Sequence, residues 1–250
     1  MKLTLFRNAT ARVEYAGQHF VMDPYLAAAF SRPTYSGKSL NPGVELPCTP
    51  QQVLEGAEFA LISHLHSDHF DPAARELLAK DLPILCQPQD AGKLAEIGFT
   101  SLHPVADRLE WRGLTVTRVA GQHGTGKVLD DMGEVSGFIW QAADEPTVYW
   151  VGDSILTDTV RDAILHYRPQ VILTHSCGAV WGPERTLILM DAGQTAEVCR
   201  LAPQSTVAAI HMEAVDHATV SRAELRAHAS AEGISPERLL IPADGETLIF

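Results

Sequence analysis

The most informative stretch of the chain is Phe59-Ala60-Leu61-Ile62-Ser63-His64-Leu65-His66-Ser67-Asp68-His69-Phe70. The apolar residues at its start predict a buried strand. Three imidazoles and one carboxylate follow within six residues, and His64 and His66 are two apart, so in an extended backbone they project to the same side. Imidazole nitrogens and a carboxylate oxygen suit divalent Zn, Mn or Fe. The stretch therefore predicts a strand that delivers metal ligands into a loop.

The residues after this loop predict a helix and then an alternation of strands and helices. Asp71-Pro72 is typical of a helix N-cap followed by proline in the first turn, and a helical pattern continues to Lys80. Further strands are expected at 83–86, 113–119, 137–140, 147–151, 170–174 and 206–210, and helices at 89–97, 158–167, 192–201 and from 221 onward. This alternation predicts an α/β fold, a mixed sheet system with helices outside.

The first 50 residues divide into a β-meander and a long irregular segment. Short alternating stretches at 3–5, 13–15 and 20–22 predict three strands, with a hairpin turn at 16–18. Residues 26–50 are rich in Pro, Gly and Ser and follow no regular period. A segment of this length inside a compact domain is usually functional or disordered, so a flap over the site and a surface excursion both remain open. Thr49-Pro50 predicts a helix start and Gly56 its end.

The composition limits the class of protein. With 250 residues, of which 46% are hydrophobic, we expect one domain over residues 1–250. The sequence has no apolar run of membrane-spanning length, and its start lacks a signal-peptide pattern, so we expect a cytoplasmic protein. The net charge of −12 argues against binding to nucleic acid or to a membrane surface and leaves a small-molecule substrate. Homo-oligomerisation is left open.

Three later strands are each followed by a further metal-competent residue. His123 follows the strand at 113–119, Asp153 follows the strand at 147–151, and His211 follows the strand at 206–210. Open α/β sheets gather their functional groups at the carboxyl ends of strands. One such residue would mean little, but three of them form a pattern.

At this point the sequence resembles a known family. His64-Leu65-His66-Ser67-Asp68-His69 resembles the H-x-H-x-D-H signature of the metallo-β-lactamase superfamily, and His123, Asp153 and His211 match its later metal-binding motifs in order. Asp23-Pro24 resembles the "DP" that closes the first hairpin in the branch containing L-ascorbate-6-phosphate lactonase. The resemblance spans nearly the whole chain. It implies a four-layer αββα sandwich with the site at one edge of both sheets.

The resemblance also implies two divalent metal ions, Zn or Mn with Fe as a further option. It assigns His64, His66 and His123 to the first ion, Asp68, His69 and His211 to the second, and Asp153 to both. A metal-bound, bridging hydroxide would then attack a small ester, lactone or phosphoester. Asp68 and His175 are the expected catalytic residues in such a hydrolase.

Two histidines permit more than one interpretation. His175 ends an apolar strand on the same expected edge, where it could bind substrate, protonate a leaving group or serve a structural hydrogen bond. His217 follows His211 by six residues; it could replace His211 as the ligand or contact the substrate. Asp191 is expected to cap the next helix, while Cys177 is expected to be an inert loop thiol. Tyr35 and Trp181 could line a pocket.

Three competing functions follow from the same pattern. An iron-dependent dioxygenase or other redox enzyme could use this framework. A nuclease would need a basic groove, against which the acidic balance argues. A metal-binding protein without turnover is disfavoured, because all seven candidate ligands are present.

Overall fold

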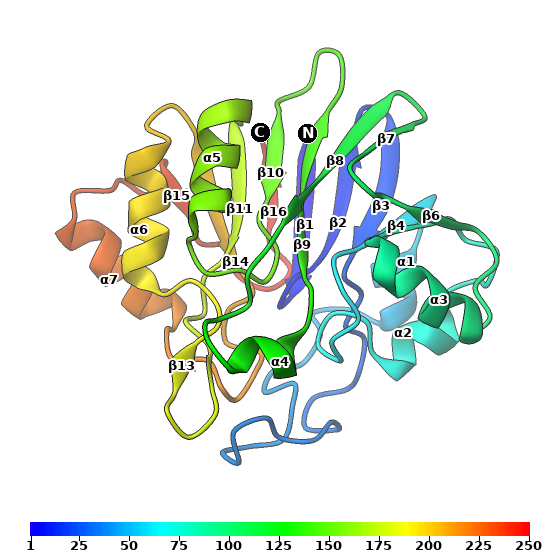
Figure 1. Ribbon diagram of the computed structural model, residues 1–250, viewed down its shortest axis with the longest axis horizontal. Helices are drawn as coiled ribbons and strands as arrows, with labels where there is room; N and C mark the ends of the chain where they lie inside the picture. The colour runs from blue at the N-terminus through cyan, green and yellow to red at the C-terminus, as the bar shows by residue number, and fades with distance from the viewer.

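Two seven-stranded sheets lie face to face at the centre of the protein, whose structure is a computed structural model describing residues 1–250 (Figure 1). The first sheet is formed by the N-terminal part of the chain and by the last strand. In spatial order its strands are β16 (Thr247–Ile249), β1 (Lys2–Arg7), β2 (Thr10–Tyr15), β3 (Gln18–Met22), β4 (Phe59–Ile62), β5 (Ile84–Cys86) and β6 (Leu102–Pro104).

The second sheet is formed by the rest of the chain. In spatial order its strands are β15 (Leu239–Leu240), β14 (Thr206–Ile210), β11 (Val171–His175), β10 (Val148–Trp150), β9 (Ser136–Gln141), β8 (Leu114–Ala120) and β7 (Arg108–Trp111). A separate two-stranded ribbon pairs β12 (Val180–Trp181) with β13 (Thr186–Leu187). In the second sheet β9 and β10 pair antiparallel and form a hairpin.

Helices cover the outer face of each sheet, as Figure 1 shows. The helices beside the first sheet are α1 (Pro50–Leu54), α2 (Pro72–Leu77) and α3 (Ala91–Glu96), the last preceded by the 3-10 turn η1 (Pro88–Asp90). Those beside the second sheet are α5 (Asp158–Tyr167), α6 (Ala192–Leu201) and α7 (Arg222–Ala231). This arrangement confirms the four-layer αββα sandwich. None of these helices is long and apolar enough to cross a membrane.

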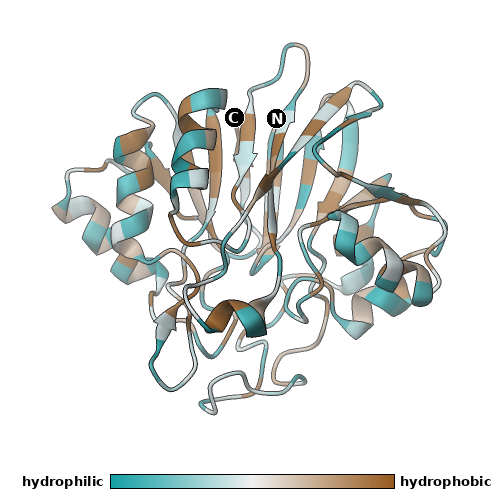
Figure 2. Cartoon of the chain, viewed as in Figure 1, coloured by the Kyte–Doolittle hydropathy of each residue, from teal (hydrophilic) through white to brown (hydrophobic).

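Three apolar clusters hold the four layers together. One lies between the two sheets, and the other two lie between each sheet and its helices. In Figure 2 brown residues alternate with paler and teal ones along the strands, and α5 and α6 carry both teal and brown residues, as expected for helices that bury one face. Between the sheets, Phe20 stacks on Phe59 with ring centroids 4.7 Å apart and meets Trp140 edge-on at 5.3 Å. This packing fixes the edges of the two sheets relative to each other.

Several strands of both sheets end at one common edge. In the first sheet β3, β4 and β5 are parallel, and β1 runs with them because β2 is antiparallel to both of its neighbours. In the second sheet β10, β11 and β14 are parallel, and β8 runs with them because β9 is antiparallel to both β8 and β10. Their carboxyl ends face the lower edge in Figure 1, where α4 (Val128–Met132) lies.

Some expected elements differ in their limits. The helix after Asp71 ends at Leu77 instead of Lys80, because Leu78 turns to an extended conformation (ψ 131°) and is buried beside the first sheet. The strands β6, β7, β15 and β16 and the helix α4 were not expected. They have five residues or fewer, too few for a clear period. Residues 26–49 are irregular apart from one bridge between Arg32 and Asn41.

Candidate metal centre

The structure brings all seven expected ligands together at the common edge of the sheets. Four come from the loop after β4, and β8, β10 and β14 each contribute one from just beyond their ends. One group whose ligand atoms lie within 4.8 Å of one another contains His64, His66, His123 and Asp153. A second contains His69, Asp153, His175 and His211. Asp153 belongs to both groups, as a residue that bridges two ions must.

The distances around Asp153 define the contact between the two groups. Its Oδ2 lies 3.3 Å from His123 Nε2 and 3.7 Å from His64 Nε2 on one side. On the other side the same oxygen lies 3.2 Å from His69 Nε2. One carboxylate oxygen therefore faces imidazole nitrogens from both groups.

Asp68 lies next to the second group. Its Oδ2 is 3.3 Å from His211 Nε2 and 3.7 Å from His69 Nε2, while the two imidazole nitrogens are 3.2 Å apart. These three side chains, which the resemblance assigns to the second ion, thus converge on one point.

Hydrogen bonds fix the orientation of the imidazoles from behind. Asp23 accepts from His69 Nδ1 at 2.6 Å and from the Ser63 hydroxyl at 2.6 Å. Because the Ser63 hydroxyl already donates its hydrogen bond to Asp23, its oxygen accepts a hydrogen bond from His64 Nδ1 at 2.9 Å. A single carboxylate thereby sets the tautomer of two histidines and leaves both Nε2 atoms directed at the centre.

The remaining imidazoles follow the same arrangement. His123 Nδ1 donates to the Ile188 carbonyl at 2.9 Å, and His211 Nδ1 lies 3.5 Å from Cys177 Sγ. His64 Nε2 is buried and has no hydrogen-bond partner. A buried nitrogen without a partner is costly in a protein that has nothing to bind there. The donor set therefore fits a metal ion.

The electrostatics of the centre also fit cations. Burial favours the neutral acid, yet the surrounding histidines hold the pKa of Asp68 and of Asp153 well below the ordinary value. Both carboxylates are buried, and the ion pairs that they form are with histidines and not with Lys or Arg. Burial opposes charge on His211, but Asp153, Cys177 and Asp68 together raise its pKa to about 10. The centre thus carries excess negative charge that attracts protons or metal ions.

His175 lies behind Asp153 and away from solvent. Its side chain is fully buried; its Nδ1 contacts Asp153 Oδ1 at 2.5 Å, and its Nε2 accepts from Trp150 Nε1 at 2.9 Å. Because Trp Nε1 can only donate, His175 Nε2 must be the acceptor and Nδ1 carries the proton. Both ring nitrogens are used, so this placement favours the structural interpretation of His175 over contact with substrate.

A pocket of about 230 Å³ opens onto the centre. His66, Asp68, His123 and Asp153 line its base, and its walls are formed by Tyr35, Ser67, Asp131, Met132, Trp181, Ile188 and His217. His217 belongs to neither ligand group, and its ring packs edge-on against Tyr35 with centroids 5.1 Å apart. The geometry therefore favours His211 as the ligand and His217 as a wall residue.

The sequence interpretation missed one residue of the centre and gave another no role. Asn8, in the turn after β1, donates its amide to the Asp68 carbonyl at 3.0 Å and lies 3.1 Å from His211 Nε2. Asp23, after β3, holds two imidazoles. The available signal was their position directly after strands that end at this edge. Of the minor expectations, Asp191 does cap α6, and Cys177 is buried against His211.

Comparison with known proteins agrees with this geometry. Residues 20–212 match the family described as "Beta-lactamase superfamily domain". The chain is 32% identical over 260 residues to the UPF0173 protein YddR of Bacillus subtilis, and the match covers 100% of both chains. A UPF0173 metal-dependent hydrolase of Azorhizobium caulinodans is 25% identical, with 79% of this chain and 82% of the relative covered.

Two solved structures resemble the whole chain. A possible metal-dependent hydrolase from Veillonella parvula has a TM-score of 0.95 at 31% identity, covering 99% of this chain and 98% of that one. An isothiocyanate hydrolase from Delia radicum gut bacteria has a TM-score of 0.93 at 32% identity, covering 100% and 99%. These matches confirm the superfamily expected from the H-x-H-x-D-H motif. The narrower assignment to the lactonase-like branch stays a prediction.

Proposed function

Because this chain belongs to the beta-lactamase superfamily domain family, with UPF0173 metal-dependent hydrolases among its relatives, we propose that it hydrolyses a small neutral electrophile. The observation that carries the proposal is the convergence of seven buried or half-buried ligand side chains at the base of a pocket. Buried imidazole nitrogens normally have hydrogen-bond partners, and a metal ion would be the partner that His64 Nε2 lacks.

The ligands divide between two ions. His64, His66 and His123 would hold the first, Asp68, His69 and His211 the second, and Asp153 both. Zn and Mn suit this set of nitrogen and oxygen donors best, and Fe is compatible with it. When bound, the ions would supply Lewis acidity and would activate a water molecule as the nucleophile.

The chain itself positions the reacting groups. His175 fixes the orientation of the Asp153 carboxylate, and Asp23 fixes His64 and His69, so the centre is held rigidly before substrate arrives. Asp68 lines the pocket with its carboxylate ionised, which allows it to accept a proton from the attacking water. Burial lowers the pKa of His217, so this imidazole is neutral near pH 7 and can hydrogen-bond to a substrate as donor or acceptor.

The pocket disfavours anionic substrates. Neither Lys nor Arg lines it, and Asp131 adds a carboxylate to its wall. A phosphoester would have only the proposed ions, and no Lys or Arg, to compensate its charge, whereas a neutral ester, a lactone or an isothiocyanate brings no charge into the pocket. We favour the isothiocyanate class, because the solved isothiocyanate hydrolase matches the chain over its full length. In that reaction water attacks the central carbon of R–N=C=S, and the overall products are R–NH₂ and carbonyl sulfide.

Metal analysis and turnover together test the proposal. Elemental analysis of untreated protein should find about two equivalents of Zn, Mn or Fe, and the metal-loaded protein should hydrolyse phenethyl isothiocyanate faster than a phosphodiester. Asp153→Ala should abolish turnover, while His19→Ala, which alters an exposed histidine far from the centre, should preserve it. Equal turnover in Asp153→Ala and in the parent protein would refute the mechanism. Bound iron with oxygen consumption and no hydrolysis would support the dioxygenase interpretation instead.

A further inference from the structure

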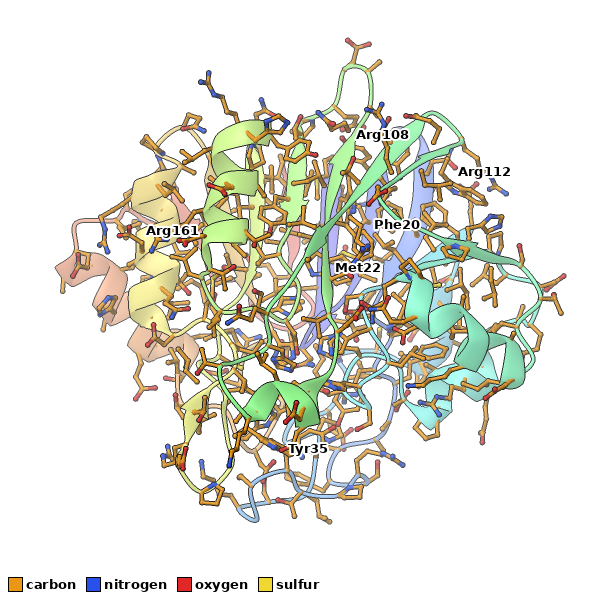
Figure 3. The ribbon with its side chains drawn as sticks, in the orientation of Figure 1. Phe20, Met22, Tyr35, Arg108, Arg112 and Arg161 are labelled. Atoms are coloured by element: carbon orange, nitrogen blue, oxygen red, sulfur yellow. The ribbon has the colours of Figure 1, made fainter.

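One wall of the pocket is aromatic and is assembled from three distant segments. Tyr35 comes from the irregular residues 26–49, Trp181 from β12, and His217 from the segment after β14. The His217 ring meets Tyr35 edge-on at 5.1 Å and Trp181 edge-on at 6.2 Å. Figure 3 shows Tyr35 below α4, at the lower edge where the strands end. These three side chains line the same pocket as the proposed ligands His66, Asp68, His123 and Asp153.

Asp216 holds the segment that carries Tyr35. Its carboxylate accepts hydrogen bonds from the Tyr35 backbone N–H at 2.9 Å, from the Thr34 hydroxyl at 2.5 Å and from the Asn41 amide at 3.0 Å. The backbone N–H and the hydroxyl of Ser36 also donate to it, at 3.0 Å and 2.8 Å. Asp216 directly precedes His217 in the sequence. The same short stretch of chain therefore carries the His217 ring and holds the backbone of its neighbour Tyr35.

The base of the same segment is fixed separately. The buried Arg7 donates to the carbonyls of Tyr25 and Ala27 at its start and of Val44 near its end. The Tyr35 hydroxyl lies 2.5 Å from Ser67 Oγ, and Ser67 stands between two proposed ligands in the signature loop. Hydrogen bonds thus hold the segment at its base through Arg7, near its tip through Asp216, and at Tyr35 through Ser67.

Tyr35 differs from the two exposed large apolar side chains of the segment, Phe30 and Leu40. Phe30 is 56% exposed and Leu40 is 50% exposed, and neither lines the pocket, whereas Tyr35 is directed inward. The segment therefore places one particular ring at the site.

We propose that Tyr35 and Trp181 are specificity-determining residues that bind an aryl substituent of the substrate, and that Asp216 is the positioning residue that sets Tyr35 in place. The substrate preference rests on the proposed function, because it concerns the hydrolysis reaction. The binding of an aryl group to this wall does not depend on that reaction. Aromatic rings favour edge-to-face and offset contacts with other rings, and such contacts add to the gain from burying the substituent. An aryl-bearing neutral substrate should thus be preferred over a small alkyl one.

The ratio of kcat/KM for phenethyl isothiocyanate to that for methyl isothiocyanate tests the wall. Tyr35→Ala and Trp181→Ala should each lower this ratio by roughly tenfold, mainly by raising KM for the phenethyl substrate. Tyr35→Phe keeps the ring and should keep the ratio. Phe30→Ala removes an exposed ring from the same segment and is the matched control. An unchanged ratio in both Tyr35→Ala and Trp181→Ala would overturn the inference.

A binding measurement separates the inference from the proposed function. The amines expected as products, phenethylamine and methylamine, serve as probes in titration calorimetry and require no turnover. If the protein hydrolyses no isothiocyanate, yet phenethylamine binds more tightly than methylamine and loses this advantage in Tyr35→Ala, the reaction is wrong and the aryl site stands. If isothiocyanates are hydrolysed without any such preference, the reaction stands and the aryl site falls.

The role of Asp216 needs its own readout. Asp216→Asn keeps the shape of the side chain but removes its charge, so the seven donors of residues 34–41 lose a charged acceptor. Amide hydrogen exchange over residues 34–41 should become at least several-fold faster, and the substrate ratio should fall toward that of Tyr35→Ala. Unchanged exchange or an unchanged ratio would show that Asp216 does not position Tyr35.

Discussion

At the residue scale, Asp23 links the two halves of the proposed centre. Its carboxylate accepts one hydrogen bond from His69 and another from the Ser63 hydroxyl. That hydroxyl in turn orients His64. The resemblance assigns these histidines to different ions, so one buried side chain tunes both sites. Partners of this kind behind ligands typically change metal affinity by 10–100-fold when they are lost. The residue that organises this centre is therefore outside its set of ligands.

Two paired variants distinguish the roles of His211 and His217. His211→Ala should lower the metal content by about one equivalent, because the Nε2 of His211 faces His69 and Asp68. His217→Ala should retain the full metal content and raise KM, because His217 lines the pocket and belongs to neither ligand group. Inductively coupled plasma spectrometry and steady-state kinetics measure the two effects. Metal loss in His217→Ala with full retention in His211→Ala would reverse the assignment.

The ligand residues were predictable individually because each has a local signal. Three histidines and an aspartate in six residues are a dense motif, and His123, Asp153 and His211 each follow an apolar strand. Asn8 has no such density, and its contact with Asp68 spans 60 residues of sequence. The burial of His175 behind Asp153 depends on the indole of Trp150, which no local pattern could reveal. The convergence in three dimensions was expected from the positions of these residues at strand ends together with the family resemblance.

At the scale of elements, the turn after β10 determines where Asp153 lies. Gly152 has φ +70°, and a Cβ built there would lie 2.5 Å from the Ser136 carbonyl oxygen of β9. Only glycine combines this left-handed conformation with such a close approach of another backbone. The position of Asp153 is therefore tied to the packing of β9 against the end of β10.

Gly152→Ala should destabilise the protein and disturb the centre, and Gly17→Ala is its matched control. Both glycines have φ +70°, so both variants carry the cost of a left-handed alanine, about 1–2 kcal/mol. At Gly17 a Cβ would meet nothing within 4 Å. Urea denaturation should show a larger loss for Gly152→Ala, accompanied by reduced metal content. Equal losses would show that the close approach does not matter.

The stabilisation that the Asp216 carboxylate gives the fold should depend on pH in a defined direction. Burial alone would raise its pKa, but the hydrogen bonds from Thr34, Asn41, the Tyr35 backbone and Ser36 hold it below the ordinary value. A depressed pKa in the folded state stabilises the fold above the unfolded pKa of about 3.9, and this stabilisation is lost as the pH falls through the folded value. The thermal midpoint of Asp216→Asn should thus lie below that of the parent by a constant amount from pH 7 to about pH 4. The difference should narrow at lower pH; narrowing already between pH 7 and 5 would contradict this account.

Elements with a strong period were predictable, and short ones were not. The strand at 206–210 and the helix at 192–201 were expected with the bounds that the structure gives them. By contrast β16 has three residues and exists because it pairs with β1, more than 240 residues away. Residues 26–49 carry no period, and the side chains of Arg7 and Asp216 that hold them lie outside the segment.

At the scale of the whole molecule, metal binding should contribute to stability. The ligands converge only in the folded chain, and the buried Asp68 and Asp153 repel each other when no cation compensates them. A ligand at one hundred times its dissociation constant adds about 2.7 kcal/mol to the free energy of unfolding. For a chain of this size, each kcal/mol corresponds to a shift of roughly 2–4 °C in the melting temperature. Removing one tightly bound ion should thus lower the melting temperature by roughly 5–11 °C.

Differential scanning calorimetry with and without a chelator measures this shift. Re-addition of Zn or Mn should restore the midpoint, and the chelator should have little effect on Asp153→Ala, which lacks the ligand shared by both proposed ions. A midpoint that ignores the chelator in metal-loaded protein would argue against a tightly bound ion at this centre.

The assignment of strands to sheets has a consequence for how the chain assembles. Apart from β16, the first sheet is complete by Pro104 and the second begins at Arg108, so a cut in the short connection between them yields two nearly whole half-molecules. Neither half contains all the ligands of either proposed ion. His64, His66 and His69 lie in the N-terminal half, and His123, Asp153 and His211 lie in the C-terminal half. Metal ions would then join the two halves through ligands from each. The two fragments, when mixed, should therefore reassociate more tightly with zinc than without it.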